Sequence, residues 1–390
     1  MTESSYRIVD ADHHYYEPDD CFTRHLESEF RDRAFHIERK QGVGIPHFGR
    51  EASYYLRATP ADRMGRPGVH AADKDSRYRP LEEEDLLCPG QIPHFVDRDA
   101  RVDWMEGQGI EAALLWPSLG LTVEWQLRDD LPACVANLRS FNRWLDESWG
   151  FAYERRIFAV PWLTLVDLPS ALRELDWVLA RGARVVHLLF TPVAGKTVAH
   201  PDFDPFWARL AEARVPVAFH GAEAGYCDLF SAAFGEPRRP PANQQSAFQR
   251  AVFWERPIMD TLAALVLHNL FGRFPSLQAM SVENGSAWVP YLLRVMDKAE
   301  KTGAYGEWLG GRIQERPSEI FRRHVLIAPF ENDDIRGLVD LLGAERVLLG
   351  SDYPHPEGLA EPRSFLSGHD LSPHESRLIS RENAAGVLGL

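Results

Sequence analysis

Short apolar runs alternate along the chain with segments whose apolar residues recur at helical spacing. The runs predict strands, and the segments with a period of three to four residues predict helices. Strands are predicted within 8–18 and at 111–116, 157–163, 184–190, 215–220, 277–282, 325–328 and 347–350. Helices are predicted at 101–108, 131–149, 168–180, 205–212, 259–271, 287–298 and 335–342.

This strand–helix order predicts a parallel sheet, because strands that are buried on both faces have nearly continuous apolar sequences. No Gly-x-Gly-x-x-Gly sequence follows the first strand, which argues against the open, dinucleotide-binding form of such a sheet. We therefore predict a (β/α)8 TIM barrel, built by a single domain over residues 1–390.

Two insertions interrupt the predicted barrel. The first, at about 35–98, follows strand one and begins with two extended runs around Gly42-Val43-Gly44, which predict a β-hairpin. Its remainder is rich in proline, glycine and charge. The second, at about 225–257, follows strand five. Long irregular segments in compact domains are often functional coverings, so we expect the first insertion to lie over the site.

The composition narrows the possible partners. The formal net charge is -14, which argues against nucleic acid and against an anionic membrane surface, since both require a basic face. The four cysteines are far apart, no amino-terminal run resembles a signal peptide, and no apolar run is long enough to span a bilayer. We expect a reduced, cytoplasmic protein that acts on a small molecule.

The stretch IVDADHHYYEP at 8–18 brings acids and histidines together directly after apolar residues. In a regularly alternating strand, Asp10, Asp12 and His14 share one face, while Ala11 and His13 share the other. Asp12 and His14 could then bind one cation from a single strand. The alternative is that they cap the short helix that the sequence predicts at 17–30.

Two further ligands end later strands, since His220 closes VPVAFHGAE and Asp352 lies in RVLLGSDYPHPEG. The carboxyl ends of barrel strands converge on one mouth, so distant residues can meet there. Mixed nitrogen and oxygen donors suit zinc, manganese or iron better than calcium or magnesium. We predict one divalent ion, zinc first, held by Asp12, His14, His220 and Asp352.

The chain resembles the amidohydrolase superfamily, specifically the amidohydrolase-related branch that includes aminocarboxymuconate-semialdehyde decarboxylase, aromatic-acid decarboxylases and several hydrolases. The resemblance rests on the segments IVDADHHYYEP, VDWMEGQGIEAALLWPS, DPFWARLAEARVPVAFHG, FGRFPSLQAMSVENGSAWVPYLL, LLGSDYPHPEG and ENAAGVLGL. It implies a (β/α)8 barrel with one divalent metal at its mouth, and a homodimer is common in this branch.

Two positions depart from the family pattern. The family's first-strand His-x-His matches Asp12-His13-His14, so Asp12 replaces a histidine and would make the metal a weaker Lewis acid. On strand six, where decarboxylases of this branch carry a histidine for proton transfer, this chain has Glu283. Glu283 either transfers protons or only bonds an amide at the next helix. The missing histidine favours hydrolysis over decarboxylation.

The expected chemistry follows from the metal. A divalent ion with an open position lowers the pKa of bound water, and Asp352 is the natural carboxylate to accept the proton. We predict a hydrolase that cleaves an ester, thioester, amide or activated C–C bond of a bulky apolar or aromatic acyl substrate. The alternatives are a non-oxidative decarboxylase of an aromatic or unsaturated carboxylic acid, and a non-catalytic barrel that acts as a binding protein.

Other residues are candidates for supporting roles. His355 could orient a ligand or the substrate, and His268 could act in catalysis. We expect His187 to be a buried, hydrogen-bonded residue and His13 to be structural. Glu17 could reach the ion as an extra ligand or could simply belong to a turn.

The substrate pocket is less well marked. Trp116 and the other tryptophans make a bulky or aromatic substrate plausible, although most tryptophans belong to protein cores. Arg57 and Arg250, one in each insertion, could hold a substrate carboxylate through two hydrogen bonds, or could simply be solvated.

Overall fold

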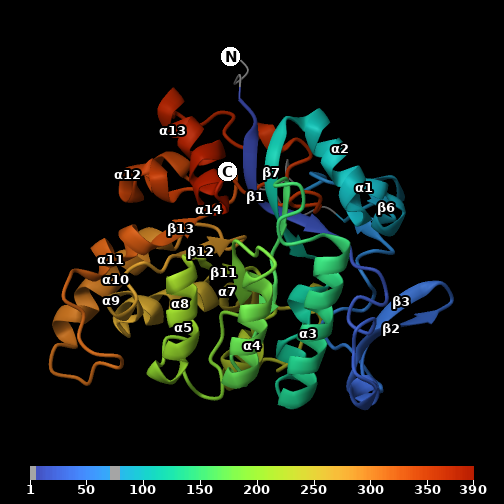
Figure 1. The fold of residues 1–390 in the computed structure, drawn as a ribbon, viewed down its shortest axis with the longest axis horizontal. Helices are drawn as coiled ribbons and strands as arrows, with labels where there is room; N and C mark the ends of the chain where they lie inside the picture. The colour runs from blue at the N-terminus through green and yellow to red at the C-terminus, as the bar shows by residue number, and fades with distance from the viewer. Residues whose placement is uncertain (1–5, 71–79) are drawn as a thin grey trace.

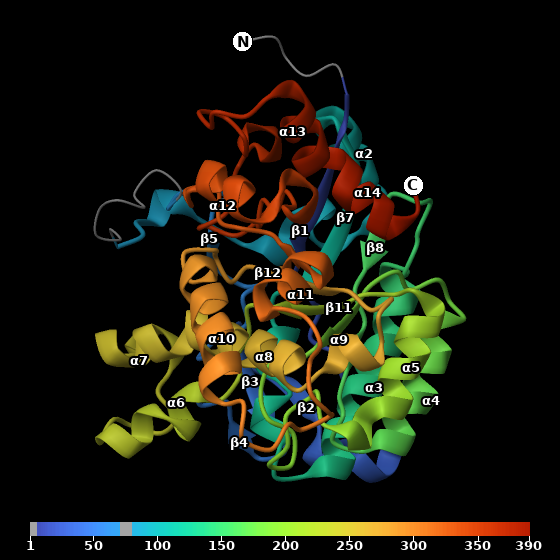
Figure 2. The ribbon, with the colours of Figure 1, turned by 90° about the vertical axis from the view of Figure 1, so that its left-hand side faces the viewer.

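A computed structural model describes residues 6–70 and 80–390. Parallel strands run in the order β1-β7-β8 and, in a second group, β13-β12-β11-β10-β9 (Figures 1 and 2). Their bounds are β1 Ile8–Tyr15, β7 Ile110–Pro117, β8 Ile157–Ala159, β9 Trp162–Leu163, β10 Val186–Leu188, β11 Val217–His220, β12 Ala279–Val282 and β13 Val325–Ile327. The predicted eight-stranded parallel barrel is the observed fold.

The segment 347–353 closes the barrel between β13 and β1. Val347 forms a parallel bridge with Ile327, and Tyr353 forms one with His13. The third barrel strand is split into β8 and β9 because Pro161 stands between them, and proline cannot donate a hydrogen bond to a neighbouring strand. The predicted strand 157–163 is therefore two short pieces.

Helices surround the strands, and both ribbon views show α3, α4 and α5 side by side on the outside of the barrel (Figures 1 and 2). Several begin at an aspartate that accepts a hydrogen bond from the first turn, as Asp97, Asp130 and Asp167 do. No helix within 6–70 and 80–390 has the length and apolarity needed to cross a membrane. The helices are α1 Pro93–Val96, α2 Arg98–Gln108, α3 Leu131–Ser148, α4 Leu168–Leu179, α5 Asp204–Ala213, α6 Tyr226–Leu229, α7 Ala247–Phe253, α8 Glu255–Leu267, α9 Leu270–Arg273, α10 Val289–Thr302, α11 Pro317–His324, α12 Ile335–Leu342, α13 Pro373–Arg377 and α14 Asn383–Leu388.

The segment after β1 contains the predicted hairpin. Strands β2 (Phe35–Lys40) and β3 (Val43–Phe48) pair antiparallel, β4 (Glu51–Ala52) joins β3, and Figure 1 shows the hairpin projecting from the barrel. Further on, β5 (Met64–Gly65) pairs with β6 (Leu86–Leu87). Residues 71–79 of this predicted insertion lie outside the described residues.

This segment contacts the loop that follows the closing strand. The amide of Gly68 donates to the carbonyl of His355 (3.4 Å), and that of His70 donates to Pro356 (2.9 Å). Part of the first predicted insertion thus packs against the loop that carries His355.

The segment after β11 contains α6 and α7 and contacts the first predicted insertion. The amide of Ala242 donates to the carbonyl of Tyr55 (3.0 Å), and the rings of Tyr55 and Phe253 stack with their centres 6.0 Å apart. At its start, Gly225 has φ +75°, and a Cβ there would overlap the ring of Trp125. Glycine is required at this turn for both reasons.

Candidate metal centre

The first strand presents its acids and histidines differently from a regular strand. Its register with β7 shifts between Asp10 and His13. As a result, Asp10 contacts His13 (3.0 Å) and accepts hydrogen bonds from the amides of Asp12 and Ser351. The prediction that Asp10 shares a face with Asp12 and His14 is wrong, because an irregularity of this kind breaks the two-residue alternation.

Asp12 and His14 come together with His220 and Asp352 at the carboxyl ends of the strands. Oδ1 of Asp12 lies 3.4 Å from Nε2 of His14 and 3.1 Å from Nε2 of His220. Nε2 of His14 also lies 3.3 Å from Oδ1 of Asp352. All four residues are buried. Asp12, His14 and His220 offer ligand atoms within 4.8 Å of one another, and His14 also belongs to a second such group with Asp352 and His355.

The two histidines are oriented as metal ligands would be. Nδ1 of His14 donates to the carbonyl of Pro117 (3.1 Å), and Nδ1 of His220 lies 3.0 Å from the carbonyl of Gly221. This leaves Nε2 of each ring for the centre. Nε2 of His14 is buried without a hydrogen-bond partner in the described chain. The set of two imidazoles and two carboxylates therefore fits a divalent cation.

The electrostatics of the centre are dominated by buried carboxyl groups. Burial raises the pKa of Asp352, and burial together with the charges of Asp352 and Asp12 raises the pKa of Glu283 well above its usual value. Burial also opposes ionisation of Asp12, but the neighbouring His220 and His14 hold its pKa below the usual range. Burial lowers the pKa of His14, which keeps the imidazole neutral, as metal binding requires. A bound cation would relieve the repulsion among these carboxylates.

Asp352 and Glu283 have unusual backbone conformations. Their φ angles are +56° and +55°, in the left-handed region that residues other than glycine seldom adopt. Such strain tends to persist at functional sites, where the surrounding structure holds it in place. Both residues belong to the buried carboxyl cluster at this end of the strands.

Glu283 follows β12 and belongs to a second cluster beside the first. Its Oε2 lies 3.3 Å from Nδ1 of His220, and its carboxylate gathers with Asp352, His355 and Glu357 within 4.8 Å. His355 donates from Nδ1 to Asp352 (2.8 Å). Burial lowers the pKa of His355, but the adjacent Asp352 outweighs this effect and raises the pKa to about 9.

The sequence analysis missed two residues here, Glu357 and Ser118. Glu357 stands in the same GSDYPHPEG stretch as Asp352, and Ser118 directly follows β7, with its Oγ 2.9 Å from Nε2 of His355. Both residues could have been found from the rule that polar side chains just after barrel strands face the mouth of the barrel.

The other candidate residues differ in whether they contact the metal centre. The ring centre of Trp116 lies 4.7 Å from that of His220, but the ring is completely buried and its Nε1 donates to the carbonyl of Ala11. Glu17 is buried, and its carboxylate accepts hydrogen bonds from the amides of Leu119 and Gly120, so its contacts are with the backbone. His187 is buried against Trp162, with ring centres 4.0 Å apart. Contrary to expectation, neither of its ring nitrogens has a hydrogen-bond partner among the described residues.

Three candidates are not brought to the centre by any contact in the described chain. His268 follows α8 and is half-buried, and burial and the charge of Arg273 lower its pKa. Arg250 donates to the carbonyl of Ala242, and Arg57 is exposed. His268 is therefore not part of the cluster, and the two arginines stay candidates from sequence alone.

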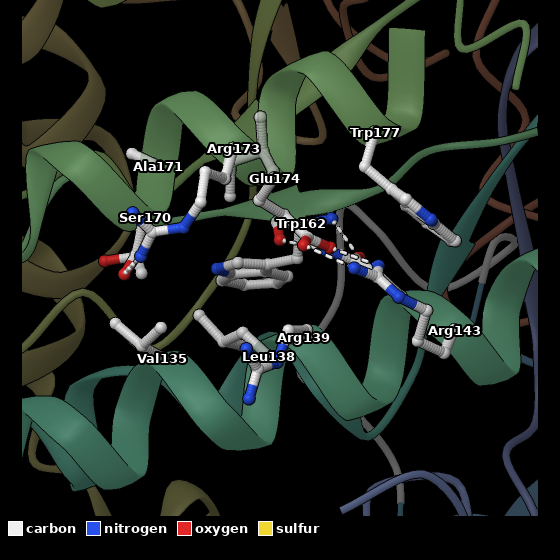
Figure 3. A pocket seen from close by; sticks show the side chains of 13 residues that line it. Val135, Leu138, Arg139, Arg143, Trp162, Ser170, Ala171, Arg173, Glu174 and Trp177 are labelled. Atoms are coloured by element: carbon white, nitrogen blue, oxygen red, sulfur yellow. Dashed lines mark hydrogen bonds and ion pairs between the residues drawn. The ribbon is translucent and has the colours of Figure 1, made fainter. Parts of the chain in front are cut away.

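A separate pocket of about 220 Å³ lies between α3 and α4 (Figure 3). Arg143 donates two hydrogen bonds to Glu174 (2.7 and 2.9 Å) and stacks on Trp177, with its guanidinium 3.3 Å from the ring centre. The ring of Trp162 lies between the two helices. No member of the metal cluster lines this pocket, which belongs to the packing of the two helices.

Glu124 contacts the Trp162 ring, and its effect on stability should depend on pH because the carboxyl group is buried. It accepts a hydrogen bond from Nε1 of Trp162, and burial raises its pKa to about 7. Because the folded pKa is above the unfolded one, the stability it provides is full below about pH 4.5 and is lost as the pH rises to about 7. We expect Glu124→Gln, which cannot ionise, to gain up to about 3 kcal/mol relative to the parent between pH 4.5 and pH 8.

Urea unfolding at pH 4.5 and at pH 8 measures this change in the free energy of unfolding relative to the parent. Glu307→Gln, which alters an exposed side chain, is the matched control. A difference between Glu124→Gln and the parent that stays constant with pH would contradict the assignment.

Comparisons with known proteins place the chain in a family. The family model described as Amidohydrolase matches residues 135–390. The crystal structure of an amidohydrolase from Mycobacterium avium subsp. paratuberculosis K-10 is 36% identical, with a TM-score of 0.89 over 99% of this chain and 100% of that chain. This chain belongs to the amidohydrolase family. A search of curated proteins found no match.

More distant structures share the amidohydrolase fold. The 2,6-dihydroxybenzoate decarboxylase from Rhizobium is 17% identical, with a TM-score of 0.64 over 98% of this chain and 99% of that chain. The 5-carboxyvanillate decarboxylase from Novosphingobium aromaticivorans DSM 12444, complexed with manganese and a nitrobenzoic acid, is 17% identical. Its TM-score is 0.60 over 100% of this chain and 98% of that chain.

Proposed function

We propose that this amidohydrolase is a metal-dependent, non-oxidative decarboxylase of a small aromatic carboxylic acid. One divalent ion would be held by Asp12, His14, His220 and Asp352. The buried, unpartnered Nε2 of His14 between two carboxylates supports such a site. Manganese is the first metal to test, because the 5-carboxyvanillate decarboxylase of the same fold is described with manganese.

The single observation that carries the reaction is the position of Glu283. Its carboxyl group lies in one cluster with Asp352 and 3.3 Å from His220, on the element where the sequence lacks the expected histidine. A carboxyl group beside bound substrate can supply the proton that decarboxylation needs. This position supports decarboxylation over the hydrolysis that the missing histidine first favoured.

The bound metal would supply a positive charge that holds the substrate carboxylate and polarises its neighbouring oxygen. Glu283 would protonate the ring carbon that carries the carboxylate, so that a C–H bond forms, the C–C bond breaks and carbon dioxide leaves. Water then returns a proton to Glu283. Trp116 packs its buried ring beside His220 and so would fix the position of that ligand rather than contact the substrate.

Hydrolysis is the second candidate, and the position of Asp352 favours it. Its Oδ1 lies 3.3 Å from Nε2 of His14, among the residues that would hold the ion. Asp352 would accept a proton from that water and pass it to the leaving group.

Isotope labelling separates the two reactions. The manganese-loaded protein is incubated with 2,6-dihydroxybenzoate or 5-carboxyvanillate in deuterated water, and in parallel with aryl esters in ¹⁸O-labelled water. We expect carbon dioxide release with one deuterium on the ring carbon. Label in a product acid instead would establish hydrolysis, and fully loaded protein inactive in both assays would argue for a binding protein.

Replacing Glu283 tests its role as proton donor. Glu283→Gln keeps the size of the side chain but removes the transferable proton, so we expect kcat to fall by about 10²-fold or more with unchanged metal content. Steady-state kinetics and metal analysis measure both. Glu357→Gln, the same change at the exposed member of the cluster, should stay within a few-fold of the parent. Equal effects of the two changes would refute the assignment.

A further inference from the structure

Pro117 and Ser118, where β7 ends, contact two imidazoles of the metal centre. The carbonyl of Pro117 accepts from Nδ1 of His14 (3.1 Å), and Oγ of Ser118 lies 2.9 Å from Nε2 of His355. The two imidazole rings are themselves 3.9 Å apart between centres. One dipeptide therefore sets the orientation of a metal ligand and of the histidine beside it.

The series Ser118, His355 and Asp352 has the spacing of a nucleophile, a base and an acid. Oγ of Ser118 to Nε2 of His355 measures 2.9 Å, and Nδ1 of His355 to Oδ1 of Asp352 measures 2.8 Å. The direction of the hydrogen bonds at the Ser118 hydroxyl argues against a nucleophilic role for Ser118. The single proton of Ser118 is donated to the carbonyl of Tyr15 (2.8 Å), which can only accept. Ser118 then accepts from His355, and its hydroxyl is not presented to a base.

The turn that carries Ser118 is held on its other side as well. The buried carboxylate of Glu17 accepts from the amides of Leu119 (3.0 Å) and Gly120 (2.8 Å), the two residues that follow Ser118. Tyr15 and Glu17 flank this turn from the end of β1. Ser118 thus stands between two fixed points and has little freedom to reorient.

We propose that Ser118 is a positioning residue of the metal centre. Fixed by the carbonyl of Tyr15, its Oγ holds the His355 ring so that Nδ1–H stays on Oδ1 of Asp352, which keeps that carboxylate directed at the ion. The inference rests on the proposed function in taking Asp352 as a ligand. Hydrogen-bonding partners of this kind commonly contribute about 10–100-fold to metal affinity or activity.

The test is Ser118→Ala with manganese affinity as the main measurement. We expect the dissociation constant for Mn²⁺, measured by calorimetry or electron paramagnetic resonance, to rise about tenfold, with kcat lowered similarly and KM within twofold. Ser276→Ala is the matched control, since its hydroxyl also donates to a backbone carbonyl, that of Ala211, on an exposed part of the chain. It should leave both quantities unchanged.

A double-variant cycle shows whether Ser118 acts through His355. In the His355→Ala background, Ser118→Ala should have no further effect on Mn²⁺ affinity. An unchanged affinity in Ser118→Ala, or effects that simply add in the double variant, would overturn the proposal. A sulfonyl fluoride adduct on Ser118 with loss of activity would show a nucleophile instead. The affinity measurements remain decisive even if the parent proves inactive toward aromatic acids.

Discussion

His220→Ala is expected to lower Mn²⁺ affinity at least about 100-fold and to reduce turnover to background. Nε2 of His220 stands 3.1 Å from Oδ1 of Asp12, and the imidazole is completely buried, so its removal deletes a donor that solvent cannot readily replace. The loss of a direct ligand should exceed the 10–100-fold that is usual for groups that only orient one. Metal analysis after dialysis, together with a Mn²⁺ titration, measures the change.

His268→Ala provides the matched control for this prediction. It removes the same side chain from a position after α8 that makes no contact with the cluster in the described chain. We expect it to retain its metal and its activity. Unaltered metal occupancy in His220→Ala would instead show that the ligand assignment is incorrect.

Much of the barrel could be predicted because its physical cause is local. A parallel strand with helices on its outer face and other strands inside must be apolar throughout, so runs such as Val215–His220 in the sequence were visible without any partner. Closure then brings the carboxyl ends together, which placed His220 beside Asp12 although more than 200 residues separate them.

The details of the first strand could not be predicted from its sequence. Regular alternation places Asp10 with Asp12, but the register with β7 shifts between Asp10 and His13. The shift depends on the pairing of β1 with a strand about 100 residues away, so the sequence of β1 alone does not predict it. The contact between Asp10 and His13, which results from this shift, was not predicted for the same reason.

Side chains that meet only through loops were also beyond the sequence. The hydrogen bond from His355 to Ser118 joins residues 237 positions apart. The stacking of Tyr55 on Phe253 joins segments from the two predicted insertions. The role of Glu283 was left open for a related reason, since its chemistry depends on the carboxylates that surround it. Burial and then the charges of Asp352 and Asp12 raise its pKa, and neither aspartate is near it in the chain.

Asp352→Asn is expected to lower kcat by about 10²–10⁴-fold while the fold is retained, whichever of the two reactions the protein catalyses. The substitution removes the negative charge that faces the metal position and the group that could accept a proton, but it preserves size and an oxygen that can accept from His355. Asparagine also adopts the left-handed conformation more readily than most residues, so φ +56° is tolerated. Kinetics at saturating Mn²⁺ measure the loss.

The metal-free protein provides the complementary measurement. Because burial raises the pKa of Asp352, its ionised form destabilises the empty centre at high pH, and the neutral amide removes that cost. The thermal midpoint of metal-free Asp352→Asn at pH 8 should therefore equal or exceed that of the parent. The control is Asp297→Asn, which weakens the hydrogen bonds that the Asp297 carboxylate accepts from the amide and hydroxyl of Ser318. This change should lower the midpoint and leave kcat unchanged. An Asp352→Asn enzyme that turns over within a few-fold of the parent would remove this carboxylate from the mechanism.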